Sequence, residues 1–249
     1  MINIQLIVAY DGTSYLGWQK TPMGPSIEGS LQHVLEKILQ RPIRLQAASR
    51  TDAGVHANGQ VVNFILDQEK INCPRLFVSL NQLLPAGIVV LDIKKAHLEF
   101  HPTLDCIKKE YCYYICCDKV QMPSQRLYSW HCPRLEHLSE MREAAAYFTG
   151  KHDFSSLCNI RKQMHYEHYI REVYSIHLEE IESKRIVFKI EGKNFLYKMV
   201  RNIVGTLVYV GLGKLKVAQV PKILSAHDRT QAGITAPAHG LFLNRVVYS

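Results

Sequence analysis

Several features that would assign a chain to a whole class of protein are missing from this sequence. No run of about 18 apolar residues occurs, so no membrane-spanning helix is predicted. The first residues, Met-Ile-Asn-Ile-Gln, lack the charged region and cleavage site of a signal peptide. Low-complexity tracts and short-period repeats are also missing. We therefore expect a soluble cytoplasmic protein without a membrane partner.

The cysteines do not form a recognisable framework. There are seven of them, an odd number, and no two have the Cys-x-x-Cys spacing. We expect reduced thiols that lie mostly in the core. His165 and His168 are not accompanied by a zinc signature such as His-Glu-x-x-His, so no metal site is predicted.

A nucleotide-binding loop is also missing. Gly-Leu-Gly-Lys at residues 211–214 resembles part of a phosphate loop, but it follows a predicted helix and no strand precedes it. The glycines are better interpreted as the C-terminal cap of that helix. No nucleotide cofactor is expected.

Length and charge set broad limits. A chain of 249 residues can form one large domain or two small ones with a substantial core. Lysine and arginine number 30 against 22 acidic residues, a net charge of +8. This excess favours a polyanionic partner without establishing one.

The hydrophobic pattern predicts a mixture of helices and strands. Apolar residues alternate in the expected strands, at 2–10, 43–48, 60–66, 88–96, 106–117, 171–182, 185–191 and 242–248. They recur with helical spacing at 26–40, 72–84, 135–148, 195–210 and, in a short segment, 217–226. We place a domain boundary at about residue 104, giving an N-terminal half (1–104) and a C-terminal half (105–249).

One polar loop between two predicted strands carries chemistry. Arg50 lies two residues before Asp52, a spacing that puts both side chains on one face of an extended chain. There a cation would keep the carboxylate ionised, and an ionised aspartate can act as nucleophile or base without a cofactor. From the residues alone, an ordinary turn with a surface ion pair is the better explanation of the loop.

This loop resembles a known catalytic loop. Arg-Thr-Asp-Ala-Gly-Val-His-Ala at residues 50–57, followed by Gly-Gln-Val at 59–61, resembles the catalytic loop of the TruA family of tRNA pseudouridine synthases. Ser49 stands where the family usually has glycine. The resemblance implies that Asp52 is the catalytic aspartate.

Other segments resemble the family in the same order along the chain. Phe-His at 100–101 with Lys-Glu-Tyr at 109–111 implies that Tyr111 is the active-site tyrosine, although a sheet core also explains such a strand. The helix motif at 195–205 implies that Arg201 pairs with Asp52; taken alone, Arg201 fits a solvated helix face. Further matches lie at residues 10–12, 15–19, 153–156 and 228–241.

The resemblance implies a fold and a function. The fold is α/β (α+β), with two similar mixed halves, largely antiparallel sheets and a central catalytic cleft. The reaction converts uridine to pseudouridine at positions 38, 39 and 40 of the tRNA anticodon stem-loop, with tRNA as partner, a homodimer as the working form and no cofactor. Asp52 would attack either C1′ of the ribose or C6 of uracil, and Arg50 would fill the space that the flipped base leaves.

Two other functions are weighed against this one. A tRNA-binding or chaperone-like protein would keep the positive charge but would not need Asp52. A carboxylate-dependent hydrolase usually needs two carboxylates a few ångströms apart, whereas the loop at 50–57 contains a single one, Asp52.

Overall fold

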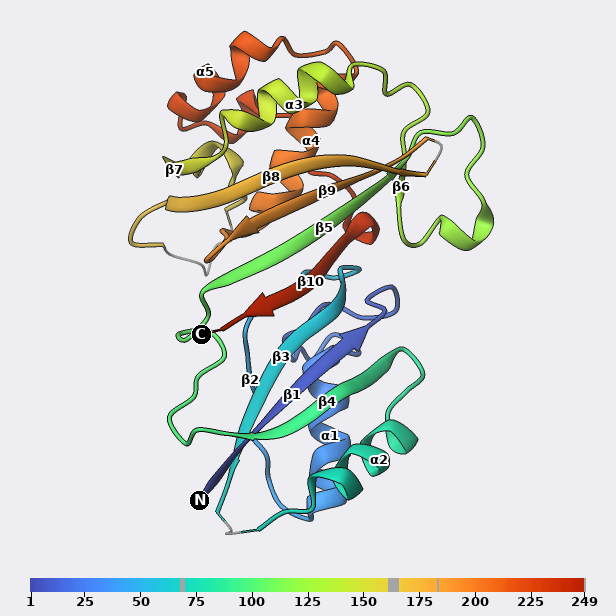
Figure 1. The fold of residues 1–249 in the computed structure, drawn as a ribbon, viewed down its shortest axis with the longest axis vertical. Coiled ribbons are helices and arrows are strands. Elements are labelled where there is room, and N and C mark those ends of the chain that lie inside the picture. The colour runs from blue at the N-terminus through green and yellow to red at the C-terminus, as the bar shows by residue number, and fades with distance from the viewer. Residues whose placement is uncertain (68–69, 161–165, 183, 249) are drawn as a thin grey trace. The chain divides into compact units, whose positions relative to one another are not determined.

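The protein is a mixed α/β structure with mostly antiparallel strands, as the sequence predicts (Figure 1). The computed structural model describes residues 1–67, 70–160, 166–182 and 184–248, so His165 lies outside the described residues. The chain divides into two compact units: unit 1 comprises Met1–Ile107 and Phe242–Ser249, and unit 2 comprises Lys108–Leu241. Within the described ranges, no helix combines the length and the apolar character that crossing a membrane requires.

Unit 1 is a mostly antiparallel sheet with two helices. The strands are β1 (Ile2–Tyr10), β2 (Gln46–Ala47), β3 (His56–Leu66), β4 (Ile88–Ala96) and β10 (Leu241–Val247), and the helices are α1 (Ile27–Leu39) and α2 (Cys73–Leu83). Their order in the sheet is β4-β1-β3-β10, with β2 also paired to β3. β10 runs parallel to β3, and Phe242 pairs with His56. Helix α2 packs on β4 and against α1 (Figure 1).

Unit 2 has the same kind of construction. Its strands are β5 (Lys108–Cys116), β6 (Trp130–His131), β7 (Gly150–Asp153), β8 (Ile170–Glu182) and β9 (Arg185–Gly192), and its helices are α3 (Leu138–Ala146), α4 (Met199–Gly211) and α5 (Val220–Ser225). The sheet order is β5-β9-β8-β7, with β6 beside β5. Helix α4 is buried on almost every side, because it is apolar around most of its circumference.

Local sequence signals explain most of these elements. Alternating apolar residues produce β1, and the Ser26 side chain caps α1 by accepting a hydrogen bond from the Gly29 amide at 3.2 Å. Asn72 caps α2 in the same way through the Arg75 amide. All seven cysteines are free and five are buried, which agrees with the prediction of reduced core thiols.

Several predicted elements have different limits in the structure; the helix expected at 135–148, for example, spans Leu138–Ala146. The strand expected at 43–48 is reduced to Gln46–Ala47, and the strand expected at 60–66 begins four positions earlier, at His56. The helix expected from residue 195 begins at Met199, because Lys198 has a left-handed backbone (φ 60°) that interrupts helical geometry. The last strand, assigned by sequence to the C-terminal half, belongs to unit 1, and the first break between units follows residue 107.

Candidate active site

The Asp52 loop spans residues 48–55 between β2 and β3 in unit 1. Its base is closed by the fully buried side chain of Gln60, which donates to the Ser49 carbonyl at 2.7 Å and accepts from the Ser49 amide at 3.2 Å. The Ala48 amide donates to the Val61 carbonyl at 2.8 Å. The loop therefore leaves the sheet from a fixed point on a rigid strand.

Thr51 anchors the middle of the loop. Its carbonyl accepts from the Trp18 amide at 3.0 Å, and its hydroxyl is 2.8 Å from the Tyr10 hydroxyl. Thr51 is 8% exposed and Tyr10 is 5% exposed, so both contacts are shielded from water. The residue that precedes Asp52 is thus held through both its backbone and its side chain.

Asp52 begins a tight turn that is closed by the Val55 amide donating to the Asp52 carbonyl at 3.1 Å. Gly54, the third residue of this turn, has φ +75°, a conformation that glycine adopts without steric cost. Gly17 packs on the other side: a Cβ there would lie 2.7 Å from the Thr51 carbonyl oxygen. Close backbone packing therefore fixes the half-buried Asp52.

His56 secures the end of the loop where β3 begins. It is fully buried, and its ring stacks on Phe242 with 4.5 Å between centroids. The Gly12 amide donates to His56 Nδ1 at 3.1 Å, and an oxygen of Asp11 lies 3.2 Å from the same nitrogen. The amide contact favours a lone pair on Nδ1 and the carboxylate contact favours a proton there, so the ring is held from two sides at one nitrogen.

Tyr111 lies in unit 2, on β5. It pairs with Ile190 of β9, is 7% exposed and meets the ring of Phe195 edge-on, with centroids 5.3 Å apart. Two residues along the strand, Tyr113 is fully buried and donates to the Pro237 carbonyl at 2.8 Å. Burial raises the pKa of the Tyr113 phenol far above its ordinary value, so this tyrosine is a structural hydrogen-bond donor.

Arg201 also lies in unit 2. The sequence placed it in the middle of a helix, but it lies in the first turn of α4, because the helix begins at Met199. Its Nε donates to the Ala236 carbonyl at 2.7 Å, and the Ala236 amide donates to the Arg201 carbonyl at 3.1 Å. Arg201 is half-buried and is held by a neighbouring segment, unlike an arginine on a solvated helix face.

The four residues that the sequence singled out are therefore divided between the units. Arg50, which is exposed, and Asp52 belong to unit 1, whereas Tyr111 and Arg201 belong to unit 2. The contact of Arg201 with Asp52 and the shared face of Arg50 and Asp52 stay predictions.

Sequence reasoning missed the residues that hold this site. It interpreted Tyr10 as a packing aromatic, which its burial confirms, but the hydroxyl also bonds Thr51. It gave no role to Asn202 or Arg229, which share a hydrogen bond of 2.9 Å. Tyr10, Asn202 and Arg229 each lie inside a motif that resembles the family, and this position could have pointed to them. Their distant hydrogen-bond partners cannot be predicted from any local sequence pattern.

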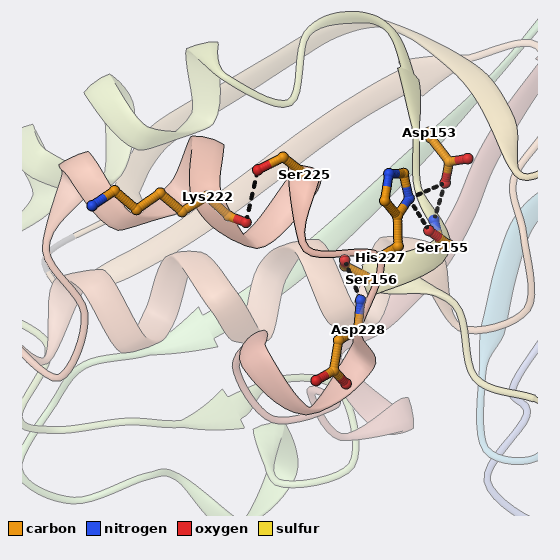
Figure 2. Close-up of polar contacts among 7 residues, drawn as sticks. All are labelled: Asp153, Ser155, Ser156, Lys222, Ser225, His227 and Asp228. Atoms are coloured by element: carbon orange, nitrogen blue, oxygen red, sulfur yellow. Dashed lines mark hydrogen bonds and ion pairs between the residues drawn. The ribbon is translucent and has the colours of Figure 1, made fainter.

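A second cluster contains a serine, a histidine and an aspartate in unit 2 (Figure 2). Ser155 Oγ lies 2.9 Å and Asp153 Oδ1 lies 3.5 Å from the same nitrogen, Nδ1 of His227. A catalytic triad needs the aspartate and the serine on opposite ring nitrogens, so this arrangement does not activate the serine. Among the described residues, no three His, Cys, Asp or Glu side chains gather as metal ligands.

A cavity of about 610 Å³ lies in unit 1 beside α1 and the end of α2. Its lining includes Lys20, His33 and Leu83 but none of the four residues that the sequence predicts for the site. The candidate site is therefore defined by the motifs and hydrogen bonds of its residues, and not by the cavity in unit 1.

Comparison with known proteins now assigns the class. A family model described as tRNA pseudouridine synthase matches residues 6–104 and 144–249, which is most of the chain. The chain belongs to the tRNA pseudouridine synthase family, so it is an enzyme that isomerises uridine to pseudouridine in tRNA. The resemblance found in the sequence is confirmed.

Individual relatives are similar over 95% or more of their length. The tRNA pseudouridine synthase A 2 of Protochlamydia amoebophila (strain UWE25) is 56% identical over 248 residues, which cover 100% of this chain and 95% of that protein. The tRNA pseudouridine synthase A of Thermoanaerobacter sp. (strain X514) is 43% identical over 248 residues, 100% of both chains. A second Protochlamydia amoebophila protein, tRNA pseudouridine synthase A 1, is 42% identical over 246 residues, covering 98% of this chain and 95% of that protein.

Proposed function

We propose that this enzyme forms pseudouridine at positions 38, 39 and 40 of the tRNA anticodon stem-loop, with Asp52 as the nucleophile. The observation that carries the proposal is the Asp52 loop, where hydrogen bonds at Thr51 and Val55 fix the backbone on both sides of Asp52 within the family-like motif. A nucleophile that must attack one carbon atom benefits from being held in place before the substrate arrives.

The reaction is an isomerisation, and its atoms balance without a redox partner. The bond from N1 of uracil to C1′ breaks, a bond from C5 to C1′ forms, and the C5 proton is lost while N1 gains one. Asp52 attacks either C1′ or C6, and these two routes stay open. No oxidant or reductant is consumed, which agrees with the expectation that the enzyme uses no cofactor.

Other residues take roles that the resemblance implies. Tyr111 packs on the base and takes the C5 proton when the ring regains aromaticity. Arg201 forms an ion pair with Asp52. The target base leaves its stack, and Arg50 fills the space that it vacates. Lysines and arginines elsewhere bind phosphates.

The proposal includes the working form and the location of the enzyme. A homodimer, as the resemblance implies, would be detected as twice the 28.5 kDa chain mass by light scattering. A single-chain mass at all concentrations would contradict it. We place the reaction in the cytoplasm, on the basis of the tRNA substrate.

The test is pseudouridine mapping on an unmodified tRNA transcript with wild-type protein and Asp52→Asn, together with filter binding. We expect pseudouridine at positions 38 to 40 from the wild type, none from Asp52→Asn, and tRNA binding by both. Asp92→Asn is the matched control, because Asp92 is an exposed aspartate on β4 of the same unit. It should keep wild-type activity.

Each other outcome has a defined meaning. Product from Asp52→Asn at the wild-type rate would show that another residue is the nucleophile. Product at other tRNA positions would show that the protein is an isomerase but that positions 38 to 40 are not its target. Binding without product from either protein would favour the tRNA-binding function that the sequence left as an alternative.

A further inference from the structure

Residues 227–236, here called the strap, form the segment that is hydrogen-bonded to Arg201. It follows α5 and lies along α4, and it contacts that helix at two levels. Near the start of the helix, Arg201 and Ala236 exchange the two hydrogen bonds described above, of 2.7 and 3.1 Å. One turn later, the Gly233 amide donates to the Thr206 hydroxyl at 3.1 Å. The position of the strap therefore fixes the position of the Arg201 side chain.

The strap touches the helix backbone itself. A Cβ on Gly205 would lie 1.7 Å from the Ile234 carbonyl oxygen, and a Cβ on Gly233 would lie 2.6 Å from the Gly205 carbonyl oxygen. Glycine at both positions lets the two backbones approach to a distance that no other residue allows. This close contact leaves the strap little room to shift along the helix.

Arg229 reaches from the start of the strap to its end and to the helix. It donates to the Gly233 carbonyl at 2.8 Å, to Asn202 Oδ1 at 2.9 Å and to the Thr235 hydroxyl at 3.0 Å. These partners are all neutral oxygens, and the Arg229 Nε is buried without a partner among the described residues. Burial lowers the pKa of the guanidinium.

This arrangement partly opposes folding. Arg229 is half-buried, so its charge is partly removed from water and faces neutral oxygens. The planar fork of arginine does offer something a neutral residue lacks: it binds three oxygens of two segments in one fixed geometry. The contacts of Arg229 therefore point to positioning.

Asn202, next to Arg201 on α4, accepts hydrogen bonds from the strap. Its Oδ1 accepts from Arg229 and, at 2.7 Å, from the Thr235 hydroxyl. Its Nδ2 donates to the Leu157 carbonyl at 2.7 Å and to Asn159 Oδ1 at 2.8 Å. Asn202 is fully buried and makes all four hydrogen bonds that its amide allows.

Hydrogen bonds to Ser155 and Ser156 hold the start of the strap (Figure 2). The Asp228 amide donates to the Ser156 hydroxyl at 3.0 Å, and His227 Nδ1 is hydrogen-bonded to Ser155 Oγ at 2.9 Å. His227 holds a left-handed backbone, φ +52°, where the chain leaves α5 and turns into the strap. The motif at residues 153–156, which had no assigned role, thus secures the segment that carries Arg229.

We propose that Arg229, with Asn202 and Thr235, is a positioning residue for Arg201, acting through the backbone of Ala236. Arg229 does not contact the substrate in this scheme. It sets the place of the Ala236 carbonyl, which in turn orients the Arg201 guanidinium. The inference rests on the proposed role of Arg201 in the reaction.

The experiment compares Arg229→Gln and Arg201→Lys, alone and combined, by single-turnover pseudouridine formation and filter binding. Lysine has no Nε–H, so Arg201→Lys loses the side-chain hydrogen bond to the Ala236 carbonyl, whereas the backbone bond from the Ala236 amide stays. We expect Arg229→Gln to slow turnover about tenfold or more with tRNA affinity unchanged, and to have no further effect in the Arg201→Lys protein. A residue that merely supports folding would lower activity in both backgrounds.

A matched pair of gentler substitutions keeps the test valid if Arg229→Gln folds poorly. Thr235→Val removes a hydroxyl that bonds Asn202 and Arg229, whereas Thr149→Val changes an exposed threonine of unit 2 that lies outside the strap. We expect Thr235→Val to slow turnover in the wild-type background but not in Arg201→Lys. Thr149→Val should turn over at the wild-type rate in both.

The outcomes separate this inference from the function on which it rests. The positioning role is wrong, and the role of Arg201 stands, if Arg201→Lys is slow and either of two results is found. In the first, Arg229→Gln and Thr235→Val slow the Arg201→Lys protein as much as they slow the wild type; in the second, they do not slow the wild type. If Arg201→Lys turns over at the wild-type rate, the proposed role of Arg201 is wrong, and the inference is wrong with it. Lost tRNA affinity in Thr235→Val would also overturn it, because positioning of Arg201 affects the reaction step.

Discussion

At the scale of single residues, the site depends on hydrogen bonds made by neighbours of the reactive groups. Thr51 is the clearest case, because its hydroxyl and its carbonyl hold the backbone next to Asp52 from two directions. The Tyr10 hydroxyl is one of these partners and lies 41 residues away in sequence. Removing it leaves the packing of the ring intact.

Tyr10→Phe should therefore slow turnover while leaving tRNA affinity unchanged. One buried hydrogen bond contributes about 1 kcal/mol, which corresponds to roughly a fivefold effect. Thr51→Val should have a similar effect, and the two changes together should cost little more than either alone. Tyr147→Phe, at a 40% exposed tyrosine of unit 2, is the control for single-turnover assays. Fully additive effects would show that the two hydroxyls act separately.

A buried thiol makes stability depend on alkaline pH. Burial, and then the nearby Glu110 carboxylate, raise the pKa of Cys112 from 9.0 to about 11. In this interval the unfolded chain has lost the thiol proton and the folded chain keeps it, so the free energy of unfolding falls as pH rises. Cys112→Ser should show a smaller decline between pH 9 and 11 in urea titrations. Equal declines in both proteins would contradict the assignment.

At the scale of elements, the contact of α4 with residues 227–236 matters most. Alanine normally favours a helix over glycine by about 1 kcal/mol. At Gly205 that gain is outweighed, because the new Cβ would lie 1.7 Å from the Ile234 carbonyl oxygen and a backbone segment would have to move.

Gly205→Ala should lower the free energy of unfolding by about 2 kcal/mol or more and slow turnover, as read by urea denaturation and single-turnover assays. Gly87→Ala is the control, since its Cβ would lie 3.6 Å from the Tyr15 ring, an ordinary contact. It should change stability by no more than about 0.5 kcal/mol. Wild-type stability in Gly205→Ala would mean that the two backbones can separate without cost.

At the scale of the whole molecule, charge and chain path matter. The net charge of +8 suits a tRNA substrate, because cationic side chains release counter-ions from phosphates. The chain also returns at its end to the unit in which it began, where β10 pairs with β3 beside His56. The Asp52 loop is thus bordered by residues from both ends of the chain.

Binding of tRNA should weaken steeply with salt, with log affinity falling linearly against log salt concentration. Between about 50 and 200 mM salt we expect a loss of at least roughly tenfold, measured by filter binding. Asp52→Asn should give the same slope, since the carboxylate is proposed to act on the base and not on phosphates. An affinity that does not change with salt would exclude phosphate contacts as the main source of binding.

The sequence alone predicted those features that depend on residues close together in the chain. Alternation along residues 2–10 predicted β1, and Ser26 predicted the start of α1, because both signals act within a few residues. The Asp52 motif is continuous in sequence, so the family could also be recognised there, and Asp52 stays the proposed nucleophile. Burial of free cysteines followed from their irregular spacing.

The tertiary structure decided what depends on residues distant in sequence. β3 begins at His56 and not at residue 60, because Gly59, which reads as a turn residue, is needed where a Cβ would lie 2.8 Å from the Asn244 carbonyl oxygen. The hydrogen bond between Tyr10 and Thr51 joins residues 41 positions apart, and the bond between Arg201 and Ala236 joins residues 35 positions apart. Folding alone brings these buried polar groups together, because each needs a partner once water is removed and the near sequence supplies none.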